Sequence, residues 1–335
     1  MVPIKRILLP QPIEKEARAL LEAENLQIVL ASDKRAEIVA PLLKVVQAVI
    51  LRTGIIFSKE LMNHADDLWI ISRTGAGVDN VDVAAATGMG ILVTCVPGAN
   101  TDSVVEHALA LILALAKQLP LMDREVRQDH FDIRFKNLPR DLKGKTLGVI
   151  GLGRIGSELA RICHLAFGMK ILAHDPYLTP EAMAVFQGWV DFCDMERLFR
   201  NADVISIHIP LLPNTKKLIG AREFGWIKSD AFLINTSRGG VLDEEALIQC
   251  LREKKIAGAG LDVFAQEPLE KDNPIKKLDN VILTPHTASL TRECVIRLAT
   301  EAAKAVIEVL HGKRPQGIVN PEVLAHPRWR GFSLA

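Results

Sequence analysis

Three polar side chains in the second half of the sequence have complementary chemistry and similar surroundings. Arg238, Glu267 and His286 each follow a short apolar run of the kind that forms a buried strand. A guanidinium can bind a carboxylate or carbonyl oxygen, an imidazole can transfer a proton, and a carboxylate can orient that imidazole and favour its protonated form. Because ligands of open α/β sheets bind beyond the carboxyl ends of the strands, we expect the three side chains to converge. Taken singly, each could also be a turn residue, a loop charge or a helix cap.

A phosphate-binding turn precedes these residues in the sequence. The apolar run Leu147–Ile150 leads into Gly151-Leu152-Gly153-Arg154-Ile155-Gly156, which has the pattern GxGxxG, and then into a helical segment. In this pattern Gly151 makes the tight turn, Gly153 lets a pyrophosphate approach the backbone, and Gly156 lets strand and helix pack closely. The phosphates would then lie at a helix N-terminus. We therefore expect a dinucleotide site; the alternative is a tight turn in another kind of α/β protein.

Asp175 bears on the choice of dinucleotide. It ends the next expected strand, 19 residues after Gly156, where a carboxylate can accept hydrogen bonds from both ribose hydroxyls. A carboxylate repels a ribose 2′-phosphate, and the following Pro176–Leu178 offers no cation to bind one. The sequence therefore predicts NAD rather than NADP. The alternative is that Asp175 is only a turn residue at the end of a strand.

Alternating Val- and Ile-rich runs and helical patterns must position these residues. The first series starts with Ile7–Leu9, a helix through Ala17–Glu24, and Gln27–Leu30. The strands expected in the second series are Leu147–Ile150, Lys170–Ala173, Val204–Ile207, Phe232–Ile234, Gly258–Leu261 and Val281–Leu283. This alternation predicts an α/β protein with two doubly wound parallel-sheet domains.

Two long helical segments, about Val104–Leu119 and Leu290–Leu310, bracket the second series. We expect the chain to enter and leave the second domain through them. This predicts a cofactor domain of residues 103–287 inserted into a discontinuous substrate-binding domain of residues 1–102 and 288–335, with a cleft between them. A length of 335 residues agrees with about two domains. We expect the helix Val104–Ala116 to expose an apolar face, which predicts a homodimer because such a face favours burial against a partner.

The composition excludes several classes of protein. The chain is 49% hydrophobic and 24% charged, with 41 basic and 40 acidic residues, so the net charge of +1 disfavours nucleic acid as a partner. The longest apolar stretch, Ala108–Ala116, is far shorter than the ~20 residues of a membrane helix, and the N-terminal residues lack the pattern of a secretory signal. The five cysteines are widely spaced, which indicates reduced core thiols and no metal site. We expect a cytoplasmic protein.

These segments together resemble the D-isomer-specific 2-hydroxyacid dehydrogenases. The matching segments, spread over nearly the whole chain, are Gly151–Gly156, Ile234–Glu244, Leu261–Pro268, Thr284–Thr287, Gly75–Asp82 and Glu106–Leu111. The resemblance implies a Rossmann-type cofactor domain, a flavodoxin-like substrate domain, and hydride transfer between NAD and C2 of a D-2-hydroxy acid. It also implies that Arg238 holds the substrate, that His286 is the acid/base, and that Glu267 tunes His286.

Further contacts follow from the same resemblance. The amides of Arg154 and Ile155 would bind the pyrophosphate, and Asp262 would contact the nicotinamide carboxamide. The loop of Gly75, Ala76 and Gly77 would bind the substrate carboxylate through backbone amides. The remaining positions implied for cofactor contact are Ala76, Ile209, Thr236 and Ser237.

Arg52 and Arg73 favour one branch of the family. With Arg134, on a loop that in this family can reach a neighbouring subunit, they resemble the phosphate-binding cations of the phosphoglycerate dehydrogenase branch, as does the segment His208–Pro213. Unpaired cations in a partly dry cleft imply an anion, so we expect 3-phosphoglycerate as substrate, oxidised in the first step of serine synthesis. The alternative is that both arginines are solvated strand-end charges and that glyoxylate, hydroxypyruvate or another 2-oxoacid is the substrate.

Two further expectations concern regulation. The chain ends soon after Val319–Val323, so we expect a short form without the regulatory domain that some phosphoglycerate dehydrogenases carry. The C-terminal-binding-protein corepressors share the fold and the site residues, but they carry a Trp near the catalytic His where this chain has Ser289. An NAD-sensing scaffold is therefore the less favoured hypothesis.

Overall fold

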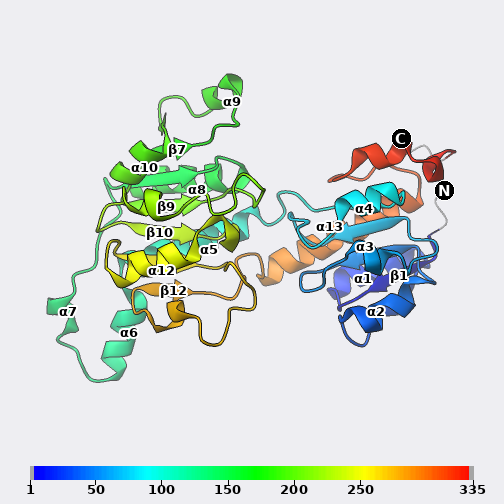
Figure 1. The fold of residues 1–335 in the computed structure, drawn as a ribbon, viewed down its shortest axis with the longest axis horizontal. Helices are drawn as coiled ribbons and strands as arrows, with labels where there is room; N and C mark the ends of the chain where they lie inside the picture. Colours follow the sequence, from blue (N-terminus) through cyan, green and yellow to red (C-terminus); the bar gives the residue numbers. More distant parts are fainter. Residues whose placement is uncertain (1–3, 332–335) are drawn as a thin grey trace. The chain divides into compact units, whose positions relative to one another are not determined.

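The computed structural model describes residues 4–331. The chain forms two compact units (Figure 1): unit 1 contains the residues up to Asn100 and those from Leu290 onward, and unit 2 contains Thr101–Ser289. Unit 2 is therefore a continuous insertion into unit 1. Each unit is built on one parallel sheet, which confirms the expected α/β fold class.

Unit 1 contains a five-stranded parallel sheet in the order β2-β1-β3-β4-β5, which is the flavodoxin-like order. Its strands are β1 Arg6–Leu9, β2 Gln27–Leu30, β3 Ala48–Leu51, β4 Ile70–Arg73 and β5 Leu92–Thr94. Alternate strand residues point to opposite faces. Ile7 and Ile50 pack in the cluster that includes α1 (Lys15–Ala23) and α13 (Arg292–Leu310). Leu8 and Val49 pack on the other face, which is covered by α2 Ala36–Leu43, α3 Lys59–Met62 and α4 Val83–Gly88.

Unit 2 contains a seven-stranded parallel sheet in the order β12-β11-β10-β9-β6-β7-β8. Its strands are β6 Thr146–Ile150, β7 Lys170–His174, β8 Val190–Phe192, β9 Val204–Ile207, β10 Phe232–Asn235, β11 Gly258–Leu261 and β12 Val281–Leu283. The strand order reverses between β6 and β9, as in a Rossmann fold, and this switch point is where dinucleotides bind. β8 was not among the expected strands, because three partly exposed residues carry little periodic signal.

Helices cover the sheet of unit 2 (Figure 1). One core cluster joins β6 to α5 (Thr101–Ala116) and α8 (Arg154–Phe167). The other contains residues of α10 Met195–Asn201, α11 Ala221–Phe224 and α12 Glu244–Arg252. The remaining helices are α6 Leu119–Arg127, α7 Ile133–Lys136 and α9 Pro180–Ala184, with short 3₁₀ turns at Gly239–Val241, Pro274–Lys277, Pro321–Ala325 and Pro327–Trp329.

One face of α5, the helix expected to expose an apolar face, is buried, whereas Ala110 is exposed and Leu109 and Leu113 are half-buried. The helix begins at Thr101 and ends at Ala116, and Val104, Ala108, Leu111 and Leu115 are all buried within this chain. Its neighbours are β10, β11 and α8, so the apolar surface is used inside unit 2. Most of the apolar surface of this helix therefore belongs to the core of unit 2, and the homodimer stays a prediction.

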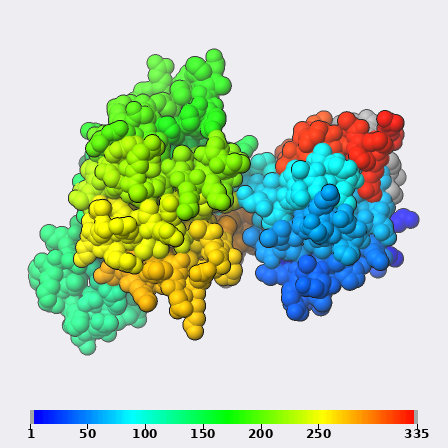
Figure 2. All heavy atoms as spheres, in the orientation of Figure 1, coloured from blue at the N-terminus to red at the C-terminus, as the bar shows by residue number. Residues whose placement is uncertain are grey.

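Exposed apolar side chains occur instead on residues 119–138, which we call the projecting segment. This segment carries α6 and α7 and extends away from the sheet of unit 2 as a separate lobe (Figures 1 and 2). Five of its large apolar side chains are between 49% and 74% exposed: Leu119, Val126, Phe131, Phe135 and Leu138.

Two further expectations concern membranes and cysteines. No single helix in residues 4–331 is long and apolar enough to span a membrane; α5 and α6 reach that length only together, and they are bent by 56°. All five cysteines are free thiols. Burial raises the pKa of Cys163 to about 12 and that of Cys250 to about 11.

Candidate active site

His286 lies beyond the carboxyl end of β12, next to Glu267. Its Nδ1 is 2.7 Å from Oε2 of Glu267. The backbone of His286 is left-handed, with φ +53°, which costs a non-glycine residue roughly 1–2 kcal/mol. Its amide donates hydrogen bonds to the carbonyls of Asp262 (2.8 Å) and Thr284 (3.0 Å). The structure therefore brings together two of the three expected site residues, in a backbone conformation that its neighbours must support.

Glu267 is set up as a hydrogen-bond acceptor. Its Oε1 accepts from the amide of Phe264 at 3.0 Å, while Oε2 faces His286. Partial burial by itself raises the pKa of Glu267, but the hydrogen bond with His286, the Phe264 amide and the charge of Arg238 lower the pKa below its usual value. Glu267 is therefore ionised at neutral pH, so Nδ1 of His286 carries a hydrogen and donates it. This leaves Nε2 of His286 for proton exchange with a ligand.

Asn235 positions the loop that carries Arg238. Asn235 is fully buried at the end of β10, and its Nδ2 donates to the carbonyl of Arg238 at 3.0 Å. Its Oδ1 accepts from both the amide and the hydroxyl of Ser237. A Cβ atom at Gly239 would lie 1.9 Å from the carbonyl carbon of Phe264, so only glycine allows this loop to pack on the loop that leads to Glu267. The charge of Arg238 also acts on Glu267, which places all three side chains in one region.

The GxGxxG turn has the geometry that a dinucleotide requires. Gly151 has φ +89°, and a Cβ atom at Gly153 would meet nothing within 4 Å, so the backbone is open to a ligand at the start of α8. Asp175 joins this turn to the end of β7, since its Oδ2 accepts from the amide of Leu152 at 2.8 Å. The second oxygen of Asp175 accepts from the amide of Tyr177 at 3.1 Å.

One buried polar atom near this region also indicates a ligand. The hydroxyl of Thr236 is buried and has no hydrogen-bond partner within residues 4–331. Buried polar groups without a partner are rare, because each carries a desolvation cost. Thr236 follows β10 at the carboxyl edge of the sheet, so a bound nucleotide would satisfy its hydroxyl there. The residues of this site therefore fit NAD.

The segment after β9 packs against the GxGxxG turn. A Cβ atom at Gly151 would lie 2.7 Å from Cγ2 of Ile209 and 2.9 Å from the carbonyl oxygen of His208. His208 is partly buried, with Nε2 2.8 Å from Oγ of Ser206. Burial lowers the pKa of His208 to about 4, so the ring is neutral at physiological pH. Ile209, one of the expected cofactor positions, is thus placed directly against the phosphate-binding turn.

In unit 1, Asn80 links Arg73 to the loop after β3. Arg73 is only 8% exposed. Its Nε donates to Oδ1 of Asn80 at 3.0 Å, Nη2 donates to Oγ1 of Thr53 at 3.1 Å, and Nη1 donates to the carbonyl of Thr74 at 2.9 Å. A Cβ atom at Gly75 would lie 2.7 Å from Nη1 of Arg73, so the first glycine of the expected carboxylate loop is needed for this close approach.

Arg52 forms an ion pair, contrary to the expectation of unpaired cations. Its Nη1 is 2.9 Å from Oε1 of Glu14 and 3.2 Å from the carbonyl of Pro12. Arg73 likewise has protein acceptors, among them Asn80, Thr53 and Thr74. The premise that these two cations are unpaired was therefore wrong, and an anion that bound them would have to replace acceptors of this chain. The partners come from loops distant in sequence, which no local pattern reveals.

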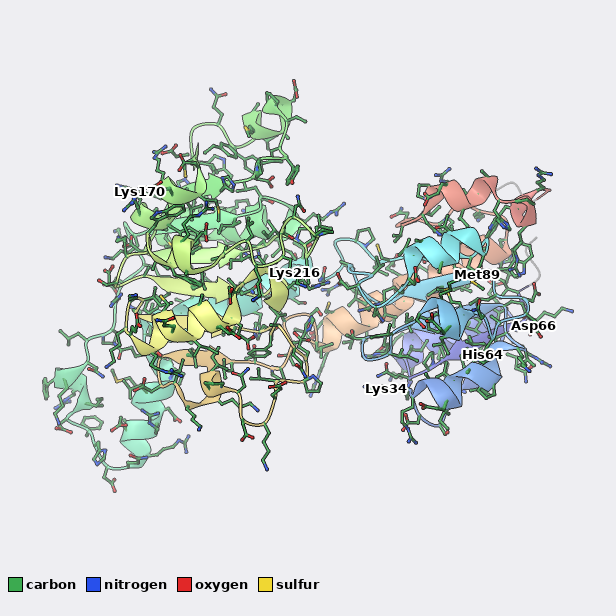
Figure 3. All side chains as sticks on the ribbon, in the orientation of Figure 1. Lys34, His64, Asp66, Met89, Lys170 and Lys216 are labelled. Carbon is green, nitrogen blue, oxygen red and sulfur yellow. The ribbon has the colours of Figure 1, made fainter. Side chains whose placement is uncertain are left out.

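Several residues of these sites were missed. Lys34 is an exposed cation in the loop after β2 that reaches the loop after β3, since a Cβ atom at Gly54 would lie 2.7 Å from its Nζ (Figure 3). Asn80 and Asn235 hold their loops in place through side-chain hydrogen bonds. The sequence signal that could have identified such residues is a polar residue inside or directly after an apolar run, as for Asn235. Arg134, one of the expected substrate-binding cations, lies on the short helix α7 of the projecting segment rather than on a loop. Its guanidinium is 4.8 Å and 4.6 Å from the ring centres of Phe131 and Phe135.

Comparisons with known proteins agree with this architecture. The model of the D-isomer specific 2-hydroxyacid dehydrogenase, NAD binding domain, matches residues 109–288. The D-3-phosphoglycerate dehydrogenase of Archaeoglobus fulgidus is 38% identical over 316 residues, which are 94% of this chain and 59% of that protein. The glyoxylate reductase of Thermofilum pendens is 42% identical over 269 residues, 79% of this chain and 78% of that protein.

A solved structure shares the fold. D-lactate dehydrogenase from Aquifex aeolicus, complexed with NAD and lactic acid, superposes with a TM-score of 0.82 and 30% identity, covering 92% of this chain and 96% of that one. The chain thus spans nearly all of this structure, whereas it spans only about 59% of the Archaeoglobus protein.

Proposed function

Because the chain belongs to the D-isomer-specific 2-hydroxyacid dehydrogenase family, we propose that it transfers a hydride between NAD and C2 of a D-2-hydroxy acid. The observation that carries this proposal is the 2.7 Å contact between His286 and Glu267, at the sheet edge that also carries the GxGxxG turn. NAD, when bound, supplies or accepts the hydride. Unit 2 is then the NAD-binding domain, and unit 1 binds the substrate.

The residues of the chain have separate roles in this proposal. Arg238 binds the substrate carboxylate and the oxygen on C2, because a guanidinium fork matches such a pair of acceptors. His286 donates a proton from Nε2 to that oxygen in reduction and removes it in oxidation. Glu267 accepts from Nδ1 and so keeps the imidazole oriented. The amides of Gly75–Gly77 bind the substrate carboxylate. Asp262 is assigned to the nicotinamide carboxamide, although its side chain is fully buried and already accepts from Thr284 and from the amides of Thr287 and Ala288.

The cofactor contacts follow the geometry of the turn. The amides of Arg154 and Ile155 at the start of α8 bind the pyrophosphate. Asp175 binds the ribose hydroxyls, because a carboxylate has four lone-pair sites and two accept from the amides of Leu152 and Tyr177. Ile209 and the hydroxyls of Thr236 and Ser237 complete the expected set, together with Ala76.

For the substrate we propose 3-phosphoglycerate. Support comes from the D-3-phosphoglycerate dehydrogenase of Archaeoglobus fulgidus and from the cations Lys34, Arg52 and Arg73 around one loop of unit 1. A phosphate carries about −2 charge and matches such a group. Since Arg52 is paired with Glu14, the phosphate would compete with that carboxylate. The second candidate is glyoxylate, which the similarity to the glyoxylate reductase of Thermofilum pendens favours.

We also propose a homodimer and a cytoplasmic location. The exposed apolar side chains of the projecting segment form a surface that a second copy of the chain would cover, and Arg134 lies on it. Five free thiols suit a reducing compartment.

The test is turnover by the purified protein. NADH oxidation is followed with 3-phosphohydroxypyruvate, hydroxypyruvate, glyoxylate and pyruvate, and NAD reduction is followed with D-3-phosphoglycerate. We expect the highest kcat/KM with the phosphorylated acid. A higher value with glyoxylate would transfer the assignment to the second candidate. Binding of NADH without turnover of any acid would contradict the dehydrogenase proposal and favour a scaffold.

A further inference from the structure

His107 contacts the segment of chain that carries His286. It is a polar residue on helix α5, and its Nε2 is 3.0 Å from Oγ1 of Thr284. Thr284 directly follows β12 and is 177 residues away from His107 in the sequence. Neither residue has a role in the proposed reaction. The two were not among the expected site residues.

Asp262 is the group that Thr284 contacts next. The Oγ1 atom of Thr284 is 2.5 Å from Oδ1 of Asp262, whose side chain is 0% exposed. The same carboxylate accepts from the amides of Thr287 and Ala288, both at 2.9 Å. Because a backbone N–H group can only donate, the carboxylate of Asp262 acts as the acceptor in these hydrogen bonds. Asp262 therefore binds residues on both sides of His286 through its side chain, and binds His286 itself through its carbonyl.

The directions of these hydrogen bonds follow from the available hydrogens. The hydroxyl of Thr284 has one hydrogen, and its short contact with the carboxylate of Asp262 uses it. The contact between Thr284 and His107 must therefore be a donation from Nε2–H of the imidazole to the hydroxyl oxygen. The result is a directed chain from His107 through Thr284 to Asp262, in which each bond polarises the next. Nε2 of His107 also lies 3.5 Å from Oδ1 of Asp262, so the imidazole faces the carboxylate directly as well as through the hydroxyl.

We propose that His107 is a positioning residue for His286, acting through Thr284 and Asp262. The left-handed backbone of His286 is unfavourable for a residue with a side chain, so it persists only where neighbours determine it. The chain of hydrogen bonds from α5 holds Asp262 in the orientation that binds the segment from 284 to 288. The His286 ring is thereby kept against Glu267. The inference rests on the proposed function in that it takes His286 as the acid/base.

Two matched pairs of variants in the full-length protein test this. Thr284→Val keeps the shape of the side chain but removes the hydroxyl, and Thr284→Ser keeps the hydroxyl. His107→Leu removes the ring N–H, and His107→Gln offers an N–H at a similar reach. The measurements are kcat and KM with NADH and the best 2-oxoacid, and amide hydrogen exchange in the peptide that contains residues 284–288. Thermal melting checks that each variant is folded.

We expect the Val and Leu variants to exchange the His286 amide roughly five-fold faster and to lose about ten-fold in kcat, with each KM changed less than about three-fold. The Ser and Gln variants should regain most of the turnover and the protection. Equal losses in both members of each pair would indicate a packing role and overturn the proposal. Unchanged exchange and kcat in the Val variant would overturn it as well.

Failure of the proposed function can be distinguished from failure of this inference. If the unmodified protein converted no 2-oxoacid, the dehydrogenase assignment would fall. Faster exchange in the Val and Leu variants, restored by Ser and Gln, would still support the role of His107 and Thr284 in holding the His286 segment. Exchange that is the same in all four variants and the unmodified protein would overturn that role.

Discussion

Glu14 and Arg52, which are 38 residues apart in the sequence, form an ion pair with 2.9 Å between Oε1 and Nη1. The side chains are 19% and 26% exposed, so water screens the pair less than it would a surface pair. Arg52 also donates to the carbonyl of Pro12 and is thus held toward the loop between β1 and α1. An anionic substrate that needs Arg52 must compete with a carboxylate of this chain.

Replacing Glu14 with Gln should therefore strengthen binding of a phosphorylated substrate. We expect the KM for 3-phosphohydroxypyruvate to fall roughly two- to five-fold, as the loss of a competing pair of up to ~1 kcal/mol would allow, and the KM for glyoxylate to stay unchanged. Glu16→Gln, in the first turn of α1, is the matched control. An equal change for both acids would mean that Arg52 does not meet the phosphate.

Loss of the imidazole at position 286 should mainly affect turnover. His286→Ala is expected to lower kcat by about 10² to 10⁴-fold, as removal of a general acid/base does, while NADH binding measured by fluorescence is retained. Glu267→Gln should have a smaller effect, and the double variant should lose much less than the product of the two, because the residues act as a unit. Near-normal kcat in a folded His286→Ala variant would remove His286 from this role.

Asp175 should determine the choice between NAD and NADP. In Asp175→Ala the ribose hydroxyls lose an acceptor, and the repulsion of a 2′-phosphate is removed, so kcat/KM should fall with NAD and rise with NADP. The Leu152 amide also loses its 2.8 Å partner, so a lower Tm is expected. The quantity to compare is the NAD/NADP ratio of kcat/KM. A ratio near one in the unmodified protein would contradict this prediction.

His208 should make unit 2 less stable in mild acid. Burial lowers its pKa to about 4, whereas an unfolded imidazole has a pKa near 6.5, so the unfolded chain takes up the proton first as the pH falls. The contribution of His208 to stability is thus complete above pH ~6.5 and declines toward pH ~4, by about 2 kcal/mol at pH 5. Urea unfolding at pH 7.5 and 5 should show this loss in the unmodified protein and not in His208→Gln.

The control for that measurement is His64→Gln. His64 is an exposed histidine of unit 1 (Figure 3), and its replacement should leave the loss of stability between the two pH values as it is in the unmodified protein. The same loss in His208→Gln as in the unmodified protein would show that another group is responsible.

The projecting segment should determine the assembly state. Phe135 and Leu138 are 74% and 73% exposed, so Phe135→Ser with Leu138→Ser should convert a dimer to a monomer in sedimentation at micromolar concentration. Ile56→Ser, at an equally exposed residue of unit 1, should leave the mass unchanged. A monomeric mass for the unmodified protein would refute the homodimer.

The sequence by itself determined the features that depend on local patterns. The GxGxxG turn, the period of the Val- and Ile-rich runs, and polar residues directly after strands were sufficient to predict the α/β class and the nucleotide turn, because strand period and turn geometry are set by neighbouring residues. Arg238, Glu267 and His286 could be named because each follows a recognisable strand.

The tertiary structure decided which side chains meet. Arg52 pairs with Glu14, one face of α5 is buried in unit 2, and His107 reaches Thr284 across 177 residues. Such contacts depend on which faces of the elements pack together. The sequence of an apolar run or a charged residue is the same whether the side chain faces solvent or the core, so the sequence alone does not identify the partner. The left-handed backbone of His286 is another example, since no glycine or asparagine marks it and the hydrogen bonds to Asp262 determine it.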